Sequence, residues 1–250
     1  MTTNPVFLVE PDALASAAVG ATVGVSGTEG RHGVSVRRLR LGESVDLVDG
    51  AGRRVSGAVS ATHRHGFDVR VDVVVDDPPP ALRLTVVQAL AKGDRGDAAV
   101  EMLTECGVDA IVPWAASRSV VRWTGDKEHR GPQRWRGVAA AATKQARRSR
   151  LPVISGLATT ADVADLVAQA RLGLVLHEAA VARLSRLDLP HGQGEIVVVV
   201  GPEGGIDDDE LARFEAAGAL TVRLGESVLR TSTAGVAATS VLMAASGRWD

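Results

Sequence analysis

The sequence predicts an α/β protein in which a small β domain precedes a larger domain built on a parallel sheet. Three observations carry this expectation. Short β-like runs alternate with turn signals over residues 1–75, and apolar runs alternate with helical segments from residue 81 onward. Asp76-Asp-Pro-Pro-Pro80 separates the two patterns, and three consecutive prolines can continue neither a sheet ladder nor a helix. We therefore expect domains at 1–75 and 81–250, joined by a stiff linker at 76–80.

The first domain is expected to be a small β-barrel or sandwich rather than a βαβ unit. Its strand-like runs are Val6–Val9, Ser44–Val48, Arg54–Val59 and Phe67–Val75. Asp-Gly and His-Gly pairs mark turns between them, as in antiparallel sheets. One helical segment is expected at 32–39.

The second domain has strands that are apolar throughout, which is typical of a parallel sheet covered on both faces. Asp207 and Glu210 are spaced as in a capping box, and Pro132 fits the first turn of a helix. The expected strands are 82–87, 110–112, 151–154, 172–176, 196–200 and 221–224. The expected helices are 97–106, 132–148, 160–170, 207–217 and 233–245.

Composition narrows the possible classes of function. The 250 residues are 45% hydrophobic and 23% charged, close to the globular average. No apolar run approaches the roughly 20 residues that cross a bilayer, so we expect no membrane partner. The lone Cys106 cannot form an internal disulfide, and no charged and apolar leader precedes Val6–Val9, so we expect a cytoplasmic protein. His32, His63 and His65 show no ligand pattern with Cys106, so no metal is expected.

The net charge of −2 conceals basic clusters that suit a polyanion, although solvated helix faces explain any one cluster equally well. The chain has no Tyr and only three Phe, so base stacking on an aromatic platform is not expected to be the main means of recognition. Trp114, Trp123 and Trp135 are expected to pack in the core or in a dimer interface.

A glycine-proline loop, Gly201-Pro-Glu-Gly-Gly205, follows the apolar run 196–200 and precedes an acidic helix start. It lacks the Lys and the Ser or Thr of a P-loop and does not fit G-x-G-x-x-G. Glu203 and the three aspartates after it would repel phosphate. A ligand without phosphates, such as adenosine attached to a sulfonium amino acid, fits better, held by backbone groups that glycines allow to approach closely. A purely structural turn is the alternative for this loop alone.

A second loop, Leu224-Gly-Glu-Ser-Val-Leu-Arg-Thr-Ser-Thr-Ala234, places three hydroxyls and an arginine where a strand passes into a helix. Thr231, Ser232 or Thr233 can cap that helix. Capping does not explain Arg230, which makes this loop a functional candidate.

Together, VGPEGGI and LGESVLRTSTA, with Lys92-Gly-Asp-Arg95 and the stretch 105–113, resemble the RsmE family of the SPOUT superfamily. The resemblance covers nearly the whole chain. It implies a PUA-like β-barrel, a parallel sheet with a C-terminal trefoil knot, a homodimer, and methylation of uridine N3 in 16S ribosomal RNA of the small subunit. Ser232 departs from the family pattern, because many relatives have Glu there, so a carboxylate at this position is not required.

The resemblance also implies a site for S-adenosylmethionine (SAM) among the knot loops. The implied cofactor-binding residues are Leu176, His177, Gly201, Pro202, Gly204, Gly205, Ile206, Leu224, Gly225, Val228, Leu229, Thr231, Ser232 and Thr233. The expected partner is small-subunit ribosomal RNA or the 30S subunit. The candidate RNA contacts are Arg37, Arg38, Arg40, Lys92, Arg95, Lys144, Arg147 and Arg148.

Methylation of uridine N3 requires an imide nitrogen to lose its proton. We expect Arg230 to stabilise the negative charge that develops on a uracil carbonyl oxygen. Glu203 is the candidate base, and it is equally suited to shaping its own loop.

Two other readings remain open beside this one. A related SPOUT enzyme would act on transfer RNA or on another ribosomal base. A non-catalytic RNA-binding or ribosome-assembly factor would keep the fold without the chemistry, and its failure to bind SAM would reveal it. A phosphate-binding dinucleotide enzyme is a fourth reading, which the loop chemistry given above disfavours.

Overall fold

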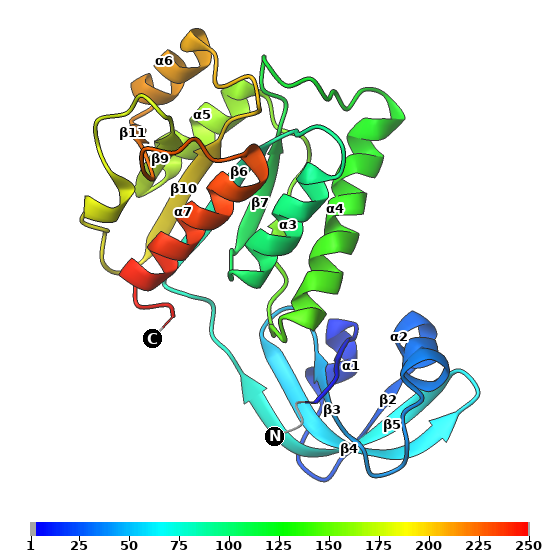
Figure 1. Ribbon diagram of the computed structural model, residues 1–250. Coiled ribbons are helices and arrows are strands. Elements are labelled where there is room, and N and C mark those ends of the chain that lie inside the picture. Colours follow the sequence, from blue (N-terminus) through cyan, green and yellow to red (C-terminus); the bar gives the residue numbers. More distant parts are fainter. Residues whose placement is uncertain (1–3, 250) are drawn as a thin grey trace. The chain divides into compact units, whose positions relative to one another are not determined.

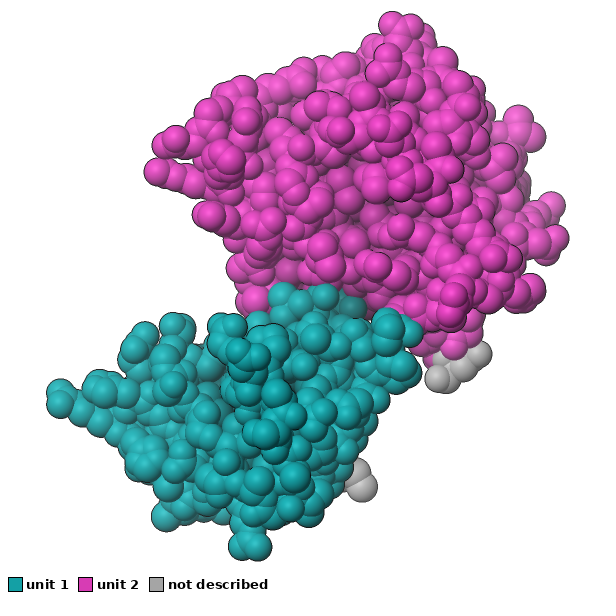
Figure 2. All heavy atoms as spheres, turned by 180° about the vertical axis from the view of Figure 1, so that it is seen from behind, with its two compact units in different colours: residues 1–79, 143–151 teal, residues 80–142, 152–250 magenta. Residues whose placement is uncertain are grey.

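The computed structural model describes residues 4–249, and the chain divides into two compact units. Unit 1 contains residues 1–79 together with 143–151, and unit 2 contains 80–142 and 152–250 (Figure 2). Residues 143–151, which lie beyond the proline linker in the sequence, therefore cluster with unit 1.

Unit 1 is built on a five-stranded sheet in the order β1-β3-β4-β5-β2. β1 is parallel to β3, and the remaining neighbours are antiparallel. The rings of Phe7 and Phe67 meet edge to face in its core, with centroids 4.9 Å apart. The strands are β1 (Val6–Leu8), β2 (Thr22–Val25), β3 (Ser44–Val48), β4 (Arg53–His63) and β5 (Gly66–Asp76).

Two short helices accompany this sheet, α1 (Pro11–Ala15) and α2 (Gly27–Arg31). A π-helical segment, His32–Arg37, continues α2, so the helical segment expected at 32–39 begins earlier than the sequence pattern indicates. Gly33 lies against the ring of Phe67 where a Cβ atom would clash, which explains a glycine inside this segment. Arg38 ends it in the left-handed conformation, with φ 54°.

Unit 2 is built on a six-stranded sheet in the order β11-β9-β10-β6-β7-β8, and all of its pairings are parallel. This confirms the parallel α/β arrangement. The valine-rich β10 is fully buried from Ile196 to Val200 because sheet neighbours and helices enclose it. The strands are β6 (Leu82–Ala89), β7 (Ala110–Trp114), β8 (Val153–Ile154), β9 (Leu172–Leu176), β10 (Gly194–Val200) and β11 (Leu220–Val222).

Helices cover both faces of this sheet (Figure 1). Val100, Trp135 and Leu242 come from the helices on one face, and Val163 and Phe214 come from those on the other. The first face carries α3 (Arg95–Glu105), α4 (Asp126–Gln145) and α7 (Thr231–Ala245), and the second carries α5 (Thr160–Gln169) and α6 (Asp208–Ala216).

Two helix-start expectations had different outcomes. The capping box at α6 is confirmed, because Asp207 accepts from the backbone N–H of Asp209 and Glu210 accepts from that of Asp207. The first-turn position of Pro132 is wrong, because α4 begins at Asp126 and holds Pro132 in its interior. Acidic residues in the first turn favour the earlier start. Within residues 4–249 no helix is long and apolar enough to cross a membrane.

Candidate functional site

The candidate site lies where β9, β10 and β11 end at the carboxyl edge of the parallel sheet, the edge at which open α/β sheets bind ligands. Two adjoining cavities of about 300 Å³ and about 90 Å³ open there. Both are lined by Leu176, His177, Glu178, Val228, Leu229 and Ala234. The GPEGG loop and the 224–234 loop thus form two walls of one site.

Most of the predicted cofactor residues meet at these cavities. Those in the lining are Leu176, His177, Gly201, Pro202, Gly205, Ile206, Leu224, Gly225, Val228, Leu229 and Thr231, and the candidate catalytic residues Glu203 and Arg230 line the larger cavity with them. Gly204, Ser232 and Thr233 do not line either cavity. Gly204 faces Arg118 instead, because a Cβ atom there would lie 3.2 Å from the Cβ and carbonyl oxygen of Arg118.

The GPEGG loop is a tight turn that requires glycine at two positions. A Cβ atom on Gly201 would lie 2.7 Å from Cγ1 of Ile206, so only glycine allows this side chain to close over the loop. Gly205 has φ +75°, a conformation that favours glycine, and its N–H donates to the carbonyl of Pro202 at 2.9 Å. The two glycines therefore allow the backbone of the loop to lie close to the cavity.

Glu203 connects the GPEGG loop to the loop that follows β6. Its carboxylate accepts hydrogen bonds from the backbone N–H of Lys92 at 3.1 Å and from the guanidinium of Arg95 at 3.4 Å. Burial alone would raise the pKa of Glu203, but hydrogen bonds from its own backbone and from Lys92, together with Arg95, outweigh burial and lower that pKa. An ionised carboxylate with these partners holds two loops together.

Arg230 occupies the N-cap position of α7 in an extended conformation. Its carbonyl accepts from the N–H groups of Thr233 and Ala234, both at 2.9 Å, whereas its own side chain is exposed at the larger cavity. The expectation that Thr231, Ser232 or Thr233 caps this helix differs from the structure, in which no side chain caps it. Thr231 and Ser232 lie inside the helix and are buried, and the Thr233 hydroxyl donates to the Arg230 carbonyl.

Gln88 is a residue of this site that the sequence reading missed. It is completely buried near the end of β6, and its Nε2 donates to the carbonyl of Thr231 at 3.3 Å and to that of Ala89 at 3.3 Å. The hydrogen bond to Thr231 attaches the first residue of α7 to the sheet, and thereby positions Arg230 next to it. An amide directly after the apolar pair Val86-Val87 was the signal that could have identified it.

His177 follows β9 and lines both cavities. Its backbone N–H donates to the carbonyl of Val222 at 2.9 Å, and its Nδ1 accepts from the N–H of Ala179 at 3.2 Å. These bonds fix the turn after β9 against the end of β11. Among residues 4–249 no group of three or more His, Cys, Asp or Glu side chains is arranged to hold a metal ion.

The predicted RNA contacts fall into different environments. In unit 1, Arg37, Arg38 and Arg40 are exposed, whereas Lys144 forms a 2.7 Å ion pair with Glu29. The remaining members are Lys92, exposed; Arg95, paired with Glu203; Arg147, exposed with φ 55°; and Arg148, half-buried. Arg37, Arg38 and Arg40 therefore form the most accessible basic cluster of unit 1.

Comparison with known proteins places both units in RNA modification. A family model described as an RNA methyltransferase domain matches residues 78–243, and one described as an RNA methyltransferase PUA domain matches residues 25–72. The ribosomal RNA small subunit methyltransferase E proteins of Mycobacterium bovis and Mycobacterium tuberculosis are each 43% identical to the chain over 236 residues, covering 92% of it and 89% of the relative.

Two solved structures have the same fold over nearly the full chain. The ribosomal RNA small subunit methyltransferase E of Neisseria gonorrhoeae, bound to S-adenosyl methionine, is 26% identical with a TM-score of 0.83 and covers 97% of this chain and 98% of its own. A methyltransferase of Legionella pneumophila in complex with SAM is 25% identical with a TM-score of 0.83 and covers 98% of each chain.

Proposed function

Because the chain belongs to the ribosomal RNA small subunit methyltransferase E family, we propose that it transfers the methyl group of SAM to N3 of a uridine in small-subunit ribosomal RNA. The observation that carries this proposal is the two-loop site, in which the backbone of the GPEGG loop and the exposed Arg230 line one cavity. Methyl transfer requires one cavity in which the nucleophile and the activated methyl donor come into contact.

The residues of the cavity fit SAM. Leu176, Ile206 and Leu229 provide apolar walls for an adenosine group, and Gly201 allows the Ile206 side chain to pack closely against the loop. When bound, the cofactor supplies an electrophilic methyl group on a sulfonium. The carboxylates of Glu203 and Glu178 are compatible with this cationic ligand, whereas they would disfavour the phosphates of a dinucleotide.

Arg230 has the properties required to activate uridine. The N3–H of uracil must be lost before its nitrogen lone pair can accept a methyl group, and the resulting charge spreads to the adjacent carbonyl oxygens. The guanidinium is exposed at the cavity, with no hydrogen bond or ion pair from its side chain in the part of the chain that the structure describes. It is therefore available to a uracil carbonyl oxygen and stabilises the anion.

We assign Glu203 to holding the site rather than to accepting the proton. Its lowered pKa makes it a weak base near neutral pH, and its carboxylate oxygen Oε1 already accepts from Lys92 and Arg95. The two loops, Gln88 and the start of α7 then hold SAM and the uridine in the positions needed for methyl transfer. Positioning of this kind suits a reaction whose methyl donor is already activated.

The finer architecture is also part of the proposal. A trefoil knot at the C-terminal end is supported by the path of the chain, because β9 lies between β10 and β11 and its following loop pairs with the end of β11. The backbone N–H of Arg223 donates to the carbonyl of Ala182 at 2.9 Å, and the backbone N–H of Leu184 donates to the carbonyl of Arg223 at 3.0 Å. We further propose a cytoplasmic homodimer that acts on RNA of the 30S subunit, with Arg37, Arg38 and Arg40 among its phosphate contacts.

Comparison of ribosomal RNA from cells with and without the gene tests this proposal. Digestion to nucleosides and mass spectrometry should show one 3-methyluridine in small-subunit RNA that depends on the gene. Loss of a methylated nucleoside from transfer RNA instead would assign the protein to a different substrate. Unchanged methylation of both RNA classes would reject the enzymatic function.

A further inference from the structure

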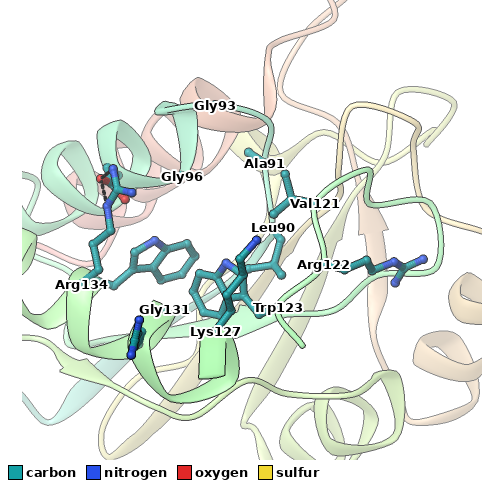
Figure 3. Close-up of a pocket in the computed structure, with 13 residues that line it drawn as sticks. Leu90, Ala91, Gly93, Gly96, Val121, Arg122, Trp123, Lys127, Gly131 and Arg134 are labelled. Carbon is teal, nitrogen blue, oxygen red and sulfur yellow. Dashed lines mark hydrogen bonds and ion pairs between the residues drawn. The ribbon is translucent and has the colours of Figure 1, made fainter. Parts of the chain in front are cut away.

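A second cavity, of about 310 Å³, opens beside the loop that follows β6. It is enclosed by that loop and α3, by the segment 121–123, and by the first turns of α4 (Figure 3). Leu90, Ala91, Gly93, Gly96 and Val121 provide its small and apolar walls. This volume is in the range of small-ligand sites, and none of the residues discussed for SAM lines it.

Two tryptophans line this cavity. Trp123 and Trp135 meet edge to face, with centroids 5.2 Å apart. Trp135 is 2% exposed and is part of the core, as expected from the sequence. Trp123 is only half-buried, and Figure 3 shows its ring projecting into the cavity. Gly131 lies so close that a Cβ atom would be 2.5 Å from the Trp123 ring, so one side of this ring packs on the α4 backbone.

Cationic side chains surround the indoles. Arg122, Lys127, Arg130 and Arg134 line the cavity, against the single carboxylate of Asp97. Arg134 is bound to Asp97 at 2.5 Å, and Arg122 turns its guanidinium away toward the carbonyls of residues 116 and 117 (Figure 3).

Lys127 and Arg130 are the cations that remain accessible here. The Lys127 ammonium makes no hydrogen bond or ion pair among residues 4–249, and the Arg130–Asp126 pair is largely exposed at 3.4 Å and thus weak. Both can turn toward an anion. An apolar slot with an aromatic ring and accessible cations at its rim suits a planar base attached to a phosphate.

One loop separates this cavity from the SAM site. Ala91 and Gly93 line the second cavity, while the intervening Lys92 donates its N–H to Glu203, which lines the first. The backbone of Lys92 and the carboxylate of Glu203 therefore join the linings of the two cavities.

We propose that this cavity binds an unpaired nucleotide of the substrate RNA that neighbours the methylated one. Its base contacts Trp123 and its phosphate contacts Lys127 and Arg130. This assignment rests on the proposed function, and it changes the expected role of Trp123 from packing in the core or in a dimer interface to base recognition.

Two fluorescent decamers test the assignment by equilibrium anisotropy with the full chain, one of uridylate and one an abasic ribose-phosphate chain. The wild type should bind the uridylate decamer about tenfold more tightly than the abasic one, as expected for base stacking. Trp123→Leu should lose most of that difference, and Trp123→Phe should keep part of it. Trp249→Leu, which removes an exposed tryptophan elsewhere, should leave it unchanged.

The double variant Lys127→Gln/Arg130→Gln should weaken binding of both decamers alike and reduce the salt dependence of affinity. Arg213→Gln, an exposed cation on α6, is the charge control. Calorimetric SAM binding and circular dichroism verify that each variant is folded. The assignment would be overturned if the difference in affinity between the uridylate and abasic decamers were equal in Trp123→Leu and Trp249→Leu. It would also be overturned if uridine monophosphate competed as strongly as the decamer, because that would indicate a site for a free nucleotide.

Methyl transfer to 30S subunits, measured with the same preparations, separates this inference from the proposed function. If the wild type methylates 30S subunits and substitution of Trp123 has no effect on RNA binding, the nucleotide cavity alone is refuted. Base-dependent binding through Trp123 without any methyl transfer refutes the proposed reaction alone.

Discussion

The carboxylate of Glu203 lies 3.4 Å from the guanidinium of Arg95, a residue 108 positions earlier in the chain. This ion pair, with the hydrogen bond from Lys92, connects the loop after β10 to the loop after β6. It assigns Glu203 and Arg95 a shared structural role, whereas the exposed Arg230 at the same cavity stays available to substrate.

Arg230→Ala should lower the rate constant of methyl transfer about a hundredfold, the usual effect of removing one donor to a developing oxyanion. SAM affinity measured by calorimetry should stay within about twofold, because the guanidinium acts on the uracil. Arg230→Lys, which keeps the charge without the planar fork, should recover part of the rate. Near-normal turnover in Arg230→Ala would exclude this residue as the stabilising group.

Glu203→Gln should keep the shape of the pH–rate profile between about pH 6 and pH 9 and lose only a few-fold in rate, because we assign Glu203 no proton transfer. A general base would instead account for about a hundredfold or more. Single-turnover assays across this range distinguish the two roles, with Arg213→Gln as a control for charge change.

The same variant tests the effect of Glu203 on stability. Its folded-state pKa lies below the ordinary value of 4.5, so its contribution is present above that pH and is lost as the pH falls through the folded-state pKa. The difference in melting temperature between wild type and Glu203→Gln should therefore shrink as the pH falls below about 4.5. A difference that grows with acidification would contradict the ion pair.

Gly201→Ala should weaken SAM binding about tenfold, because the new Cβ atom would lie 2.7 Å from Ile206 Cγ1 and force that side chain into the cavity or the loop out of its turn. Gly156→Ala is a matched control, since a Cβ atom there meets nothing within 4 Å. Calorimetry on both variants provides the comparison. Equal affinities would mean that the GPEGG turn does not shape the site.

Replacing Arg37, Arg38 and Arg40 with Gln should lower RNA affinity and reduce the slope of log affinity against log salt by about two. Lys144→Gln should lower the melting temperature without changing that slope, because its ammonium is paired with Glu29. Filter binding at several salt concentrations separates the two. An unchanged slope in the triple variant would remove this cluster from the RNA interface.

The sequence was sufficient for the parallel sheet because its strands are mainly apolar, and β9 has the predicted bounds, Leu172–Leu176. The residue pattern marked the two loops as candidates, and the resemblance to the RsmE family implied that they form one site; the structure shows that both line the same cavities. The start of α4 was missed because Pro132 resembles a first-turn proline, although Asp126 begins the helix.

Long-range pairing is what the sequence could not supply. Nothing in the local pattern shows that Lys144 pairs with Glu29 or that Arg95 pairs with Glu203. The hydrogen bond from Gln88 to Thr231 spans 143 positions and depends on the finished fold. Trp123 was expected to pack in the core or in a dimer interface, and only the packing of α4 against it shows that its ring lines a cavity.

The most direct test of the central claim is the reaction itself. The purified protein is incubated with 30S subunits from cells that lack the gene and with SAM that carries an isotopically labelled methyl group. Mass spectrometry of the nucleosides should then detect labelled 3-methyluridine in small-subunit RNA. Arg230→Ala should yield about a hundredfold less of it per unit time. Absence of labelled 3-methyluridine from wild-type reactions, with the label either unincorporated or found in another nucleoside, would contradict the account.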